Sequence, residues 1–101
     1  MAGTKIDSYE IIYSSSKTPR RIILKSGSGV AGQLVFYPLG TTLPPDGYAA
    51  GATCLNYYID DFSNCVDLLR NESPVFFSFV SAGSVNSINT GSETVGELDR
   101  L

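Results

Sequence analysis

The sequence contains no histidine and no tryptophan, and only two of its 101 residues are cysteine. Without histidine the chain cannot build a Ser-His-Asp triad, a Cys-His pair or a histidine-based metal site. Cys54 and Cys65 alone do not supply the four ligands of a structural zinc site. We therefore expect no metal, no cofactor and no catalytic residue in this chain.

Carboxylates are the remaining side chains that could perform acid–base chemistry, and the candidates are Asp60, Asp61, Asp67 and Glu72. Asp60 and Asp61 directly precede a predicted helix, so we interpret them as caps of its first turn. Asp67 falls on the polar side of the same helix. An enzyme is therefore the least favoured class of function.

Charge is also scarce: 17% of the residues are charged, the net charge is −3 and the sequence pI is near 4.6. This balance disfavours nucleic acid and anionic membrane surfaces as partners. No apolar run approaches the roughly 18 residues of a membrane span, and no basic region followed by an apolar stretch opens the chain. We expect a cytoplasmic protein with neither nucleic-acid nor membrane partners.

The strongest periodic pattern predicts a helix in the second half of the chain. Phe62, Cys65, Val66 and Leu69 lie at positions i, i+3, i+4 and i+7, which is one face of a helix. Pro74 cannot continue a helix, so the helix has to end before it. The predicted helix is about three turns long and needs a sheet to cover its apolar face.

Period-two alternation and β-prone composition predict the strands. They span residues 8–13, 20–25, 30–37, 55–59, 75–80 and 85–89. The expected fold is α+β: an antiparallel sheet of five to six strands with one helix packed on one face, in the order β-β-β-loop-β-α-β-β. We expect a single domain over residues 1–90 and a flexible acidic tail over residues 91–101.

A glycine-rich stretch, Gly27–Gly32, matches the pattern G-x-G-x-x-G of dinucleotide-binding loops. That loop binds a pyrophosphate only when a helix begins directly after it. Here the following residues, 33–37, are β-prone and Pro38 leaves no room for a helix. The stretch therefore predicts a glycine-rich hairpin and no nucleotide site.

Residues 38–53 form a long connection with three prolines and three glycines. A connection of this length in a small domain either has a function or wraps the edge of the sheet. Aromatic side chains gather in it and in the strands beside it, and exposed tyrosines are common on binding surfaces. The predicted interface or ligand surface consists of Phe36, Tyr37, Tyr48, Tyr57 and Tyr58.

One segment resembles a known group of sequences. Residues 67–77, DLLRNESPVFF, are followed by ETVGE at residues 93–97. They are similar to small bacterial domains in which a DLLRNEKP-type helix end leads into an apolar strand and an EPVGE-like tail closes the chain. In this chain Ser73 replaces the lysine and Thr94 the proline. The resemblance implies a bacterial source and no particular activity or site residue.

The second half of the strand at 30–37 is apolar on both faces, which indicates a central strand or a subunit contact. With the lack of catalytic residue types, this favours a non-enzymatic interaction module that self-associates through its sheet as a homodimer or higher oligomer. The alternative is a small-molecule binding domain, in which the 38–53 connection is a lid over a pocket lined by Tyr37, Tyr48 and Tyr58.

Overall fold

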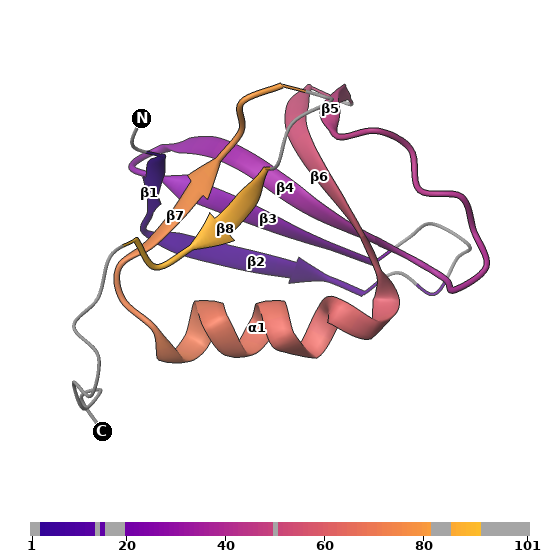
Figure 1. Cartoon of the computed structure of the whole chain (residues 1–101). Helices are drawn as coiled ribbons and strands as arrows, with labels where there is room; N and C mark the ends of the chain where they lie inside the picture. The colour runs from indigo at the N-terminus through magenta and orange to yellow at the C-terminus, as the bar shows by residue number, and fades with distance from the viewer. Residues whose placement is uncertain (1–2, 14, 16–19, 50, 82–85, 92–101) are drawn as a thin grey trace.

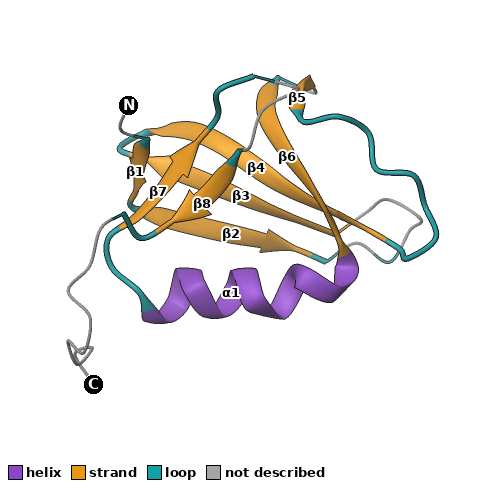
Figure 2. Cartoon of the chain, viewed as in Figure 1, coloured by secondary structure: helices purple, strands orange, loops and turns teal. Residues whose placement is uncertain are grey.

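The computed structural model describes residues 3–13, 15, 20–49, 51–81 and 86–91. In these ranges the chain forms one α-helix, one short 3₁₀ helix and eight strands, so the predicted α+β class is confirmed (Figure 2). The elements are β1 (Thr4–Ile6), β2 (Ser8–Ile12), β3 (Arg20–Ser26), β4 (Gly29–Tyr37), β5 (Gly47–Ala49), β6 (Ala52–Tyr58), η1 (Ile59–Asp61), α1 (Phe62–Asn71), β7 (Val75–Ser78) and β8 (Ser87–Asn89).

The strands form two sheets, so the expectation of one antiparallel sheet is wrong. The larger sheet has the order β2-β3-β4-β6-β5 and the smaller one the order β1-β7-β8. All pairs are antiparallel except β4 and β6, which run parallel. Parallel neighbours need a crossover connection, and the long segment after β4 supplies it by returning the chain to the end of the sheet where β4 began (Figure 1).

Two short strands lie where the sequence predicts none. The chain passes from the small sheet into the large one at Asp7, whose N–H donates to the carbonyl of Lys25 at 2.8 Å. This change of sheet lets β1 pair with β7, although its residues have little strand pattern of their own. In the long connection, β5 pairs with β6 through a turn at Gly51, where φ is +81°. Pairing therefore decides both strands: the partner of β1 is distant in sequence, and the partner of β5 is the next strand along the chain.

The helix α1 agrees with the predicted bounds, because it begins at Phe62 and ends at Asn71, before Pro74. Its predicted cap is wrong: Asp61 occupies the N-cap position, but its carboxylate makes no capping hydrogen bond. Asp60 and Asp61 instead belong to the 3₁₀ helix η1, which runs directly into α1. Their negative charge still lies at the positive end of the helix dipole.

The core lies between the two sheets and α1. The face of the large sheet that is turned toward the small sheet and α1 is called the inner face here. It is close-packed against β7: a Cβ added to Gly32 would lie 2.4 Å from the Phe77 ring, so the absence of a side chain on β4 admits the aromatic ring. The buried core residues of the three layers are Ile22, Leu24, Leu34, Phe36, Leu55, Cys65 and Phe77.

The predicted hairpin at Gly27–Gly32 is confirmed, because β3 and β4 pair as antiparallel neighbours around a turn at Gly27, where φ is +61°. The last predicted strand is shorter than expected and starts at Ser87; its first predicted residue, Val85, lies outside the described ranges. The predicted acidic tail also lies outside them, apart from Gly91.

The opposite, outer face of the large sheet is partly covered as well. On β4 the side chains of Leu34 and Phe36 are on the inner face, and those of Gln33 and Val35 are on the outer face. Gln33 is 4% exposed and Val35 is 8% exposed. Figure 1 shows that the chain after β4 leaves the right-hand end of the sheet and returns beside it to β5. This connection contributes to a cavity on the outer face.

Candidate functional site

The cavity on the outer face has a volume of about 400 Å³, and we call it the outer cavity. A volume of this size is in the range of ligand pockets, about 300–1,000 Å³. The sheet supplies its floor from alternate positions of β3, β4 and β6, and the connection supplies its wall. The lining residues are Arg21, Gln33, Val35, Tyr37, Cys54 and Asn56 from the sheet, and Pro44, Pro45, Asp46, Gly47 and Tyr48 from the connection.

The wall is fixed to the sheet by hydrogen bonds around Asn56. The backbone N–H of Asn56 donates to Asp46 Oδ1 at 2.8 Å. Its side-chain Nδ2 donates to the carbonyls of Pro44 and Pro45, each at 3.1 Å. The second carboxylate oxygen of Asp46 accepts from Asn86 Nδ2 at 3.1 Å. Residues 44–46 are therefore held at two sites and form a defined wall.

Two polar atoms in the floor of the outer cavity have no partner. Gln33 Oε1 and Arg21 Nε are buried and lack a hydrogen bond in the described part of the structure. A buried polar group without a partner is destabilising by roughly 1–3 kcal/mol, so such groups are rare in folded proteins. Both residues line the same cavity. The structure thus leaves one acceptor and one donor unsatisfied at a single place.

The structure separates the five residues of the predicted surface. Phe36 is 1% exposed and lies in the core, so it is not part of a surface. Tyr57 is also on the inner face, where its ring stacks on Phe36 with the centroids 5.5 Å apart. Burial, followed by the nearby Cys65, Asp46 and Asp61, raises the pKa of Tyr57 well above its usual value.

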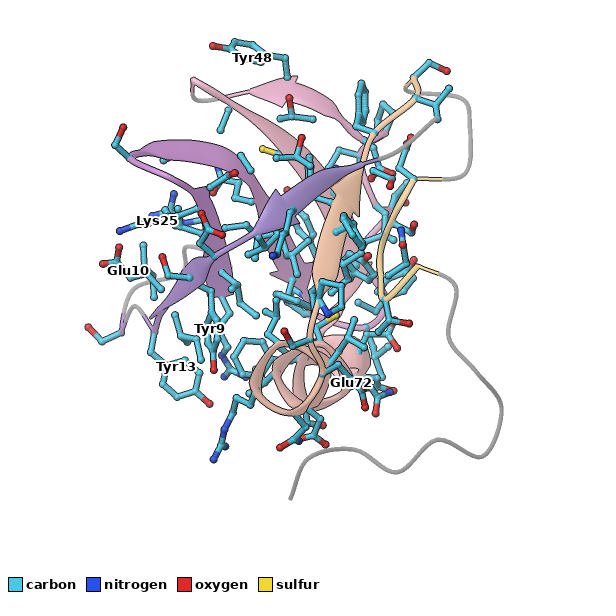
Figure 3. All side chains as sticks on the ribbon, turned by 90° about the vertical axis from the view of Figure 1, so that its left-hand side faces the viewer. Tyr9, Glu10, Tyr13, Lys25, Tyr48 and Glu72 are labelled. Atoms are coloured by element: carbon cyan, nitrogen blue, oxygen red, sulfur yellow. The ribbon has the colours of Figure 1, made fainter. Side chains whose placement is uncertain are left out.

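The other three tyrosines are on or beside the outer face. Tyr37 and Tyr58 are direct neighbours on β4 and β6, and both are half-buried. Tyr48 is 77% exposed and projects from the end of the molecule in Figure 3. Tyr37 and Tyr48 line the outer cavity, whereas Tyr58 does not. The outer cavity lies beside the connection, and the hypothesis that the connection is a lid stays a prediction.

Sequence reasoning missed the residues that distinguish this cavity, Arg21 and Gln33. Gln33 is the one polar side chain inside the apolar run of residues 30–37, and this was the signal that could have found it. Arg21 stands beside Arg20, and alternation along β3 places them on opposite faces. The sequence alone does not show which of these faces is covered.

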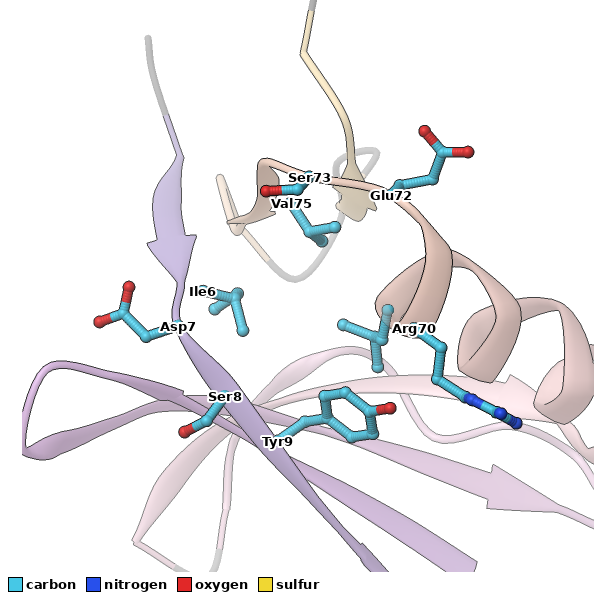
Figure 4. A pocket seen from close by; sticks show the side chains of 9 residues that line it. Ile6, Asp7, Ser8, Tyr9, Arg70, Glu72, Ser73 and Val75 are labelled. Atoms are coloured by element: carbon cyan, nitrogen blue, oxygen red, sulfur yellow. The ribbon is translucent and has the colours of Figure 1, made fainter. Parts of the chain in front are cut away.

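A second cavity of about 470 Å³ lies between the end of α1 and the junction of β1 with β2. Its charged lining residues are Asp7, Arg70 and Glu72, and in Figure 4 their charged groups point away from one another. Among its lining residues, no buried side-chain atom lacks a hydrogen bond in the described structure. It is larger than the outer cavity, but among its described lining residues it has no buried polar atom that lacks a partner.

The four acidic candidates lie in η1, in α1 and directly after α1. Asp60, Asp61 and Asp67 are exposed. In the described ranges, no three metal-ligating side chains come together. Cys54 and Cys65 are both buried, and burial, then the charge of Asp61, raises the pKa of the Cys65 thiol to about 11. A thiol that stays protonated at neutral pH is a poor nucleophile.

The only α-helix of the described structure, α1, has ten residues, and no helix there has the length and apolar character of a membrane span. Comparison with known proteins gives no match to any protein-family model, curated protein or solved structure. The resemblance to small bacterial domains stays a prediction. The outer cavity, where Gln33 Oε1 and Arg21 Nε are buried without a hydrogen-bond partner among the described residues, is therefore the candidate site that the geometry supports.

Proposed function

We propose that this chain is a non-enzymatic binding domain that takes a small molecule into the outer cavity. The observation that carries the proposal is Gln33, which is 4% exposed and whose carbonyl oxygen has no hydrogen-bond partner among the described residues. The unpartnered Oε1 contributes nothing to the stability of the fold, because an apolar group would fill the same space without its desolvation penalty. A ligand that donates a hydrogen bond to Gln33 explains why a glutamine is there.

The chemistry of the cavity wall supports binding over catalysis. Its single carboxylate, Asp46, accepts hydrogen bonds with both oxygens, from Asn56 and from Asn86. These bonds occupy the group that would have to act as a base. The walls are otherwise apolar or aromatic with a few polar groups, as ligand pockets usually are. A cytoplasmic location belongs to the same proposal, and the free thiol of Cys65 is compatible with it.

Self-association through the sheet is the second candidate function. The apolar outer face of β4 first motivated it, but the chain's own fold already buries Val35 there. The observation that still favours it is the free edge of β2, next to which Ile11 is 41% and Tyr13 is 68% exposed. Sedimentation equilibrium separates the candidates: we expect the 10.8 kDa monomer at 50 μM, whereas a dimer that Ile11→Lys dissociates would favour self-association.

The binding proposal is tested by a ligand screen with amide-resolved NMR. Small aromatic acids, amides and amines are added to the ¹⁵N-labelled protein. We expect the hits to shift the amide signals of Gln33, Val35 and Asn56. Hits that shift only signals around Leu69 and Arg70 would move the site to the second cavity, and a screen without hits would overturn the proposal.

A blocking variant sharpens the test. Gly47 lies directly opposite Cys54 in the β5–β6 pair, so a side chain at Gly47 projects from the cavity side of the sheet. A Cβ at this position has no atom within 4 Å, so the first atom of a leucine side chain meets no neighbour in Gly47→Leu. It is expected to abolish the shifts. The matched control is Gly29→Leu in the distant β3–β4 hairpin, which should leave them unchanged.

A further inference from the structure

Two consecutive arginines of β3 have different surroundings. The Arg20 guanidinium lies over the rings of Tyr13 and Phe62, at 4.3 Å and 5.3 Å from their centroids. These contacts give Arg20 a structural role as the cation of two cation–π pairs. Arg21 points to the other face, lines the outer cavity and has neither a ring nor a carboxylate as a partner in the described structure. Its charge is available to a ligand.

Arg21 and Gln33 are close enough to contact one small molecule. In the β3–β4 pair Arg21 is opposite Val35 and Gln33 is opposite Ile23, so the two side chains are diagonal neighbours on the outer face. Diagonal neighbours on adjacent strands are separated by roughly 7 Å at the backbone. They do not satisfy each other, because Arg21 Nε and Gln33 Oε1 are both unpartnered. A ligand between them has to present an acceptor to the arginine and a donor to the glutamine.

Apart from Arg21 and Gln33, much of the lining of the outer cavity is apolar or aromatic. Val35 lies in the floor, Pro44 and Pro45 form one wall, and the rings of Tyr37 and Tyr48 line the opening. Aromatic and proline surfaces favour a flat apolar group of the ligand. Of the acceptors that a guanidinium binds, a carboxylate matches its planar, two-pronged geometry best.

We propose that the outer cavity binds a small carboxylate with a hydrogen-bond donor beside the acid group and an aromatic body, the chemistry of an N-acylated aromatic amino acid. Arg21 binds the carboxylate, the Gln33 carbonyl accepts the ligand N–H, and the aromatic body lies against Tyr37 and the prolines. This inference rests on the proposed function, because it specifies the ligand of the same cavity.

Three compounds test the inference, with affinity measured by NMR titration of the full chain. N-acetyl-L-phenylalanine has the acid, the N–H and the ring; N-acetyl-L-phenylalaninamide replaces the acid by a neutral amide; and 3-phenylpropanoate lacks the N–H. We expect the first to bind about tenfold more tightly than the amide, the ratio typical of one hydrogen bond to a charged group. Loss of the N–H should weaken binding by roughly fivefold.

The two arginines supply the matched variants. Arg21→Gln is expected to remove the preference for the acid over the amide, whereas Arg20→Gln should lower the stability of the fold and keep the preference. Equal binding of acid and amide to the unaltered protein would overturn the carboxylate inference. The same holds if none of the three compounds binds. If other compounds of the screen still shift Gln33 and Val35, the proposed function stands without the inference; if no compound does, both fail.

Discussion

At the scale of single residues, the stability of the fold and the proposed ligand binding place opposite requirements on the buried amide of Gln33. The unsatisfied Oε1 destabilises the free protein, because its hydration is lost and no hydrogen bond replaces it. Replacement by methionine keeps the length of the side chain and removes the unmet acceptor. We expect Gln33→Met to raise the free energy of unfolding in urea by about 1 kcal/mol and to weaken binding of N-acetyl-L-phenylalanine.

The control for Gln33→Met is Asn56→Leu, which also replaces an amide on the outer face by an apolar group. The Asn56 amide donates to the carbonyls of Pro44 and Pro45, so its loss should destabilise the protein by about 1–3 kcal/mol. If both variants lose stability, Gln33 has a structural partner and the argument for a ligand is lost.

Asp46 connects the cavity wall to β6 and to Asn86, and its removal should loosen the wall. We expect Asp46→Ala to lower the free energy of unfolding by about 1–3 kcal/mol, because two donors lose their acceptors. Hydrogen exchange at the Asn56 amide should accelerate more than exchange elsewhere in β6. Asp60→Ala is the control, and this exposed side chain should change stability by less than about 0.5 kcal/mol. Equal effects of the two variants would contradict the anchoring role of Asp46.

At the scale of elements, the contact between β4 and β7 depends on a missing side chain. A methyl group at Gly32 would lie 2.4 Å from the Phe77 ring, and the core is too densely packed to move the ring freely. We expect Gly32→Ala to lower the free energy of unfolding by about 1–3 kcal/mol. Gly29→Ala, on the same strand but with its nearest atom at 4.0 Å, should have almost no effect.

A second substitution tests the origin of the Gly32 effect. Phe77→Leu replaces the ring that the new methyl group meets by a smaller side chain. It should therefore lower the free energy of unfolding less in the Gly32→Ala background than in the native protein. Strictly additive losses in the double variant would show that the close approach of Gly32 to Phe77 is not the cause.

The packing of α1 against the large sheet predicts a loss of stability in alkali. The pKa of the Cys65 thiol is 9.0 when the thiol is in water, as in the unfolded chain, and about 11 in the folded chain. As the pH rises, the unfolded state therefore loses this proton first. Tyr57 shifts in the same direction. The contribution of the Cys65 thiol to the free energy of unfolding should be constant below about pH 8 and fall as pH rises from 9.0 to about 11.

Urea unfolding at several pH values measures this dependence. Cys65→Ala is expected to be less stable than the native chain at pH 7, because it leaves a small void in the core. Above pH 9 the free energy of unfolding of this variant should fall less steeply than that of the native chain, because the variant lacks the Cys65 thiol. The same slope in both proteins would mean that the thiol of Cys65 does not contribute to the alkaline transition.

Elements with strong local patterns are predictable from the sequence, and their assembly is not. The spacing of Phe62, Cys65, Val66 and Leu69 predicts α1 within a residue, because helix periodicity is local. The parallel pairing of β4 with β6 depends on the path of the connection after Tyr37, which no local pattern specifies. No local pattern specifies the division into two sheets either, because it depends on the change of sheet at the junction of β1 and β2.

At the scale of the whole molecule, the covered outer face changes the functional argument. Apolar residues on both faces of one strand predict either a second subunit or a cover from the same chain, and the sequence does not distinguish them. The structure places the chain's own connection beside this face and leaves a cavity between them. Tyr37 and Tyr48 were predictable parts of this site, whereas Arg21 and Gln33 required knowledge of which face is covered.

The most direct measurement is the set of intermolecular NOEs from the phenyl protons of bound N-acetyl-L-phenylalanine to side chains of the protein. Binding in the outer cavity predicts NOEs to the methyl groups of Val35 and to the ring protons of Tyr48. NOEs to the methyl groups of Leu69 and Val75, which line the second cavity, would contradict this account, and so would the absence of any NOE at saturating ligand.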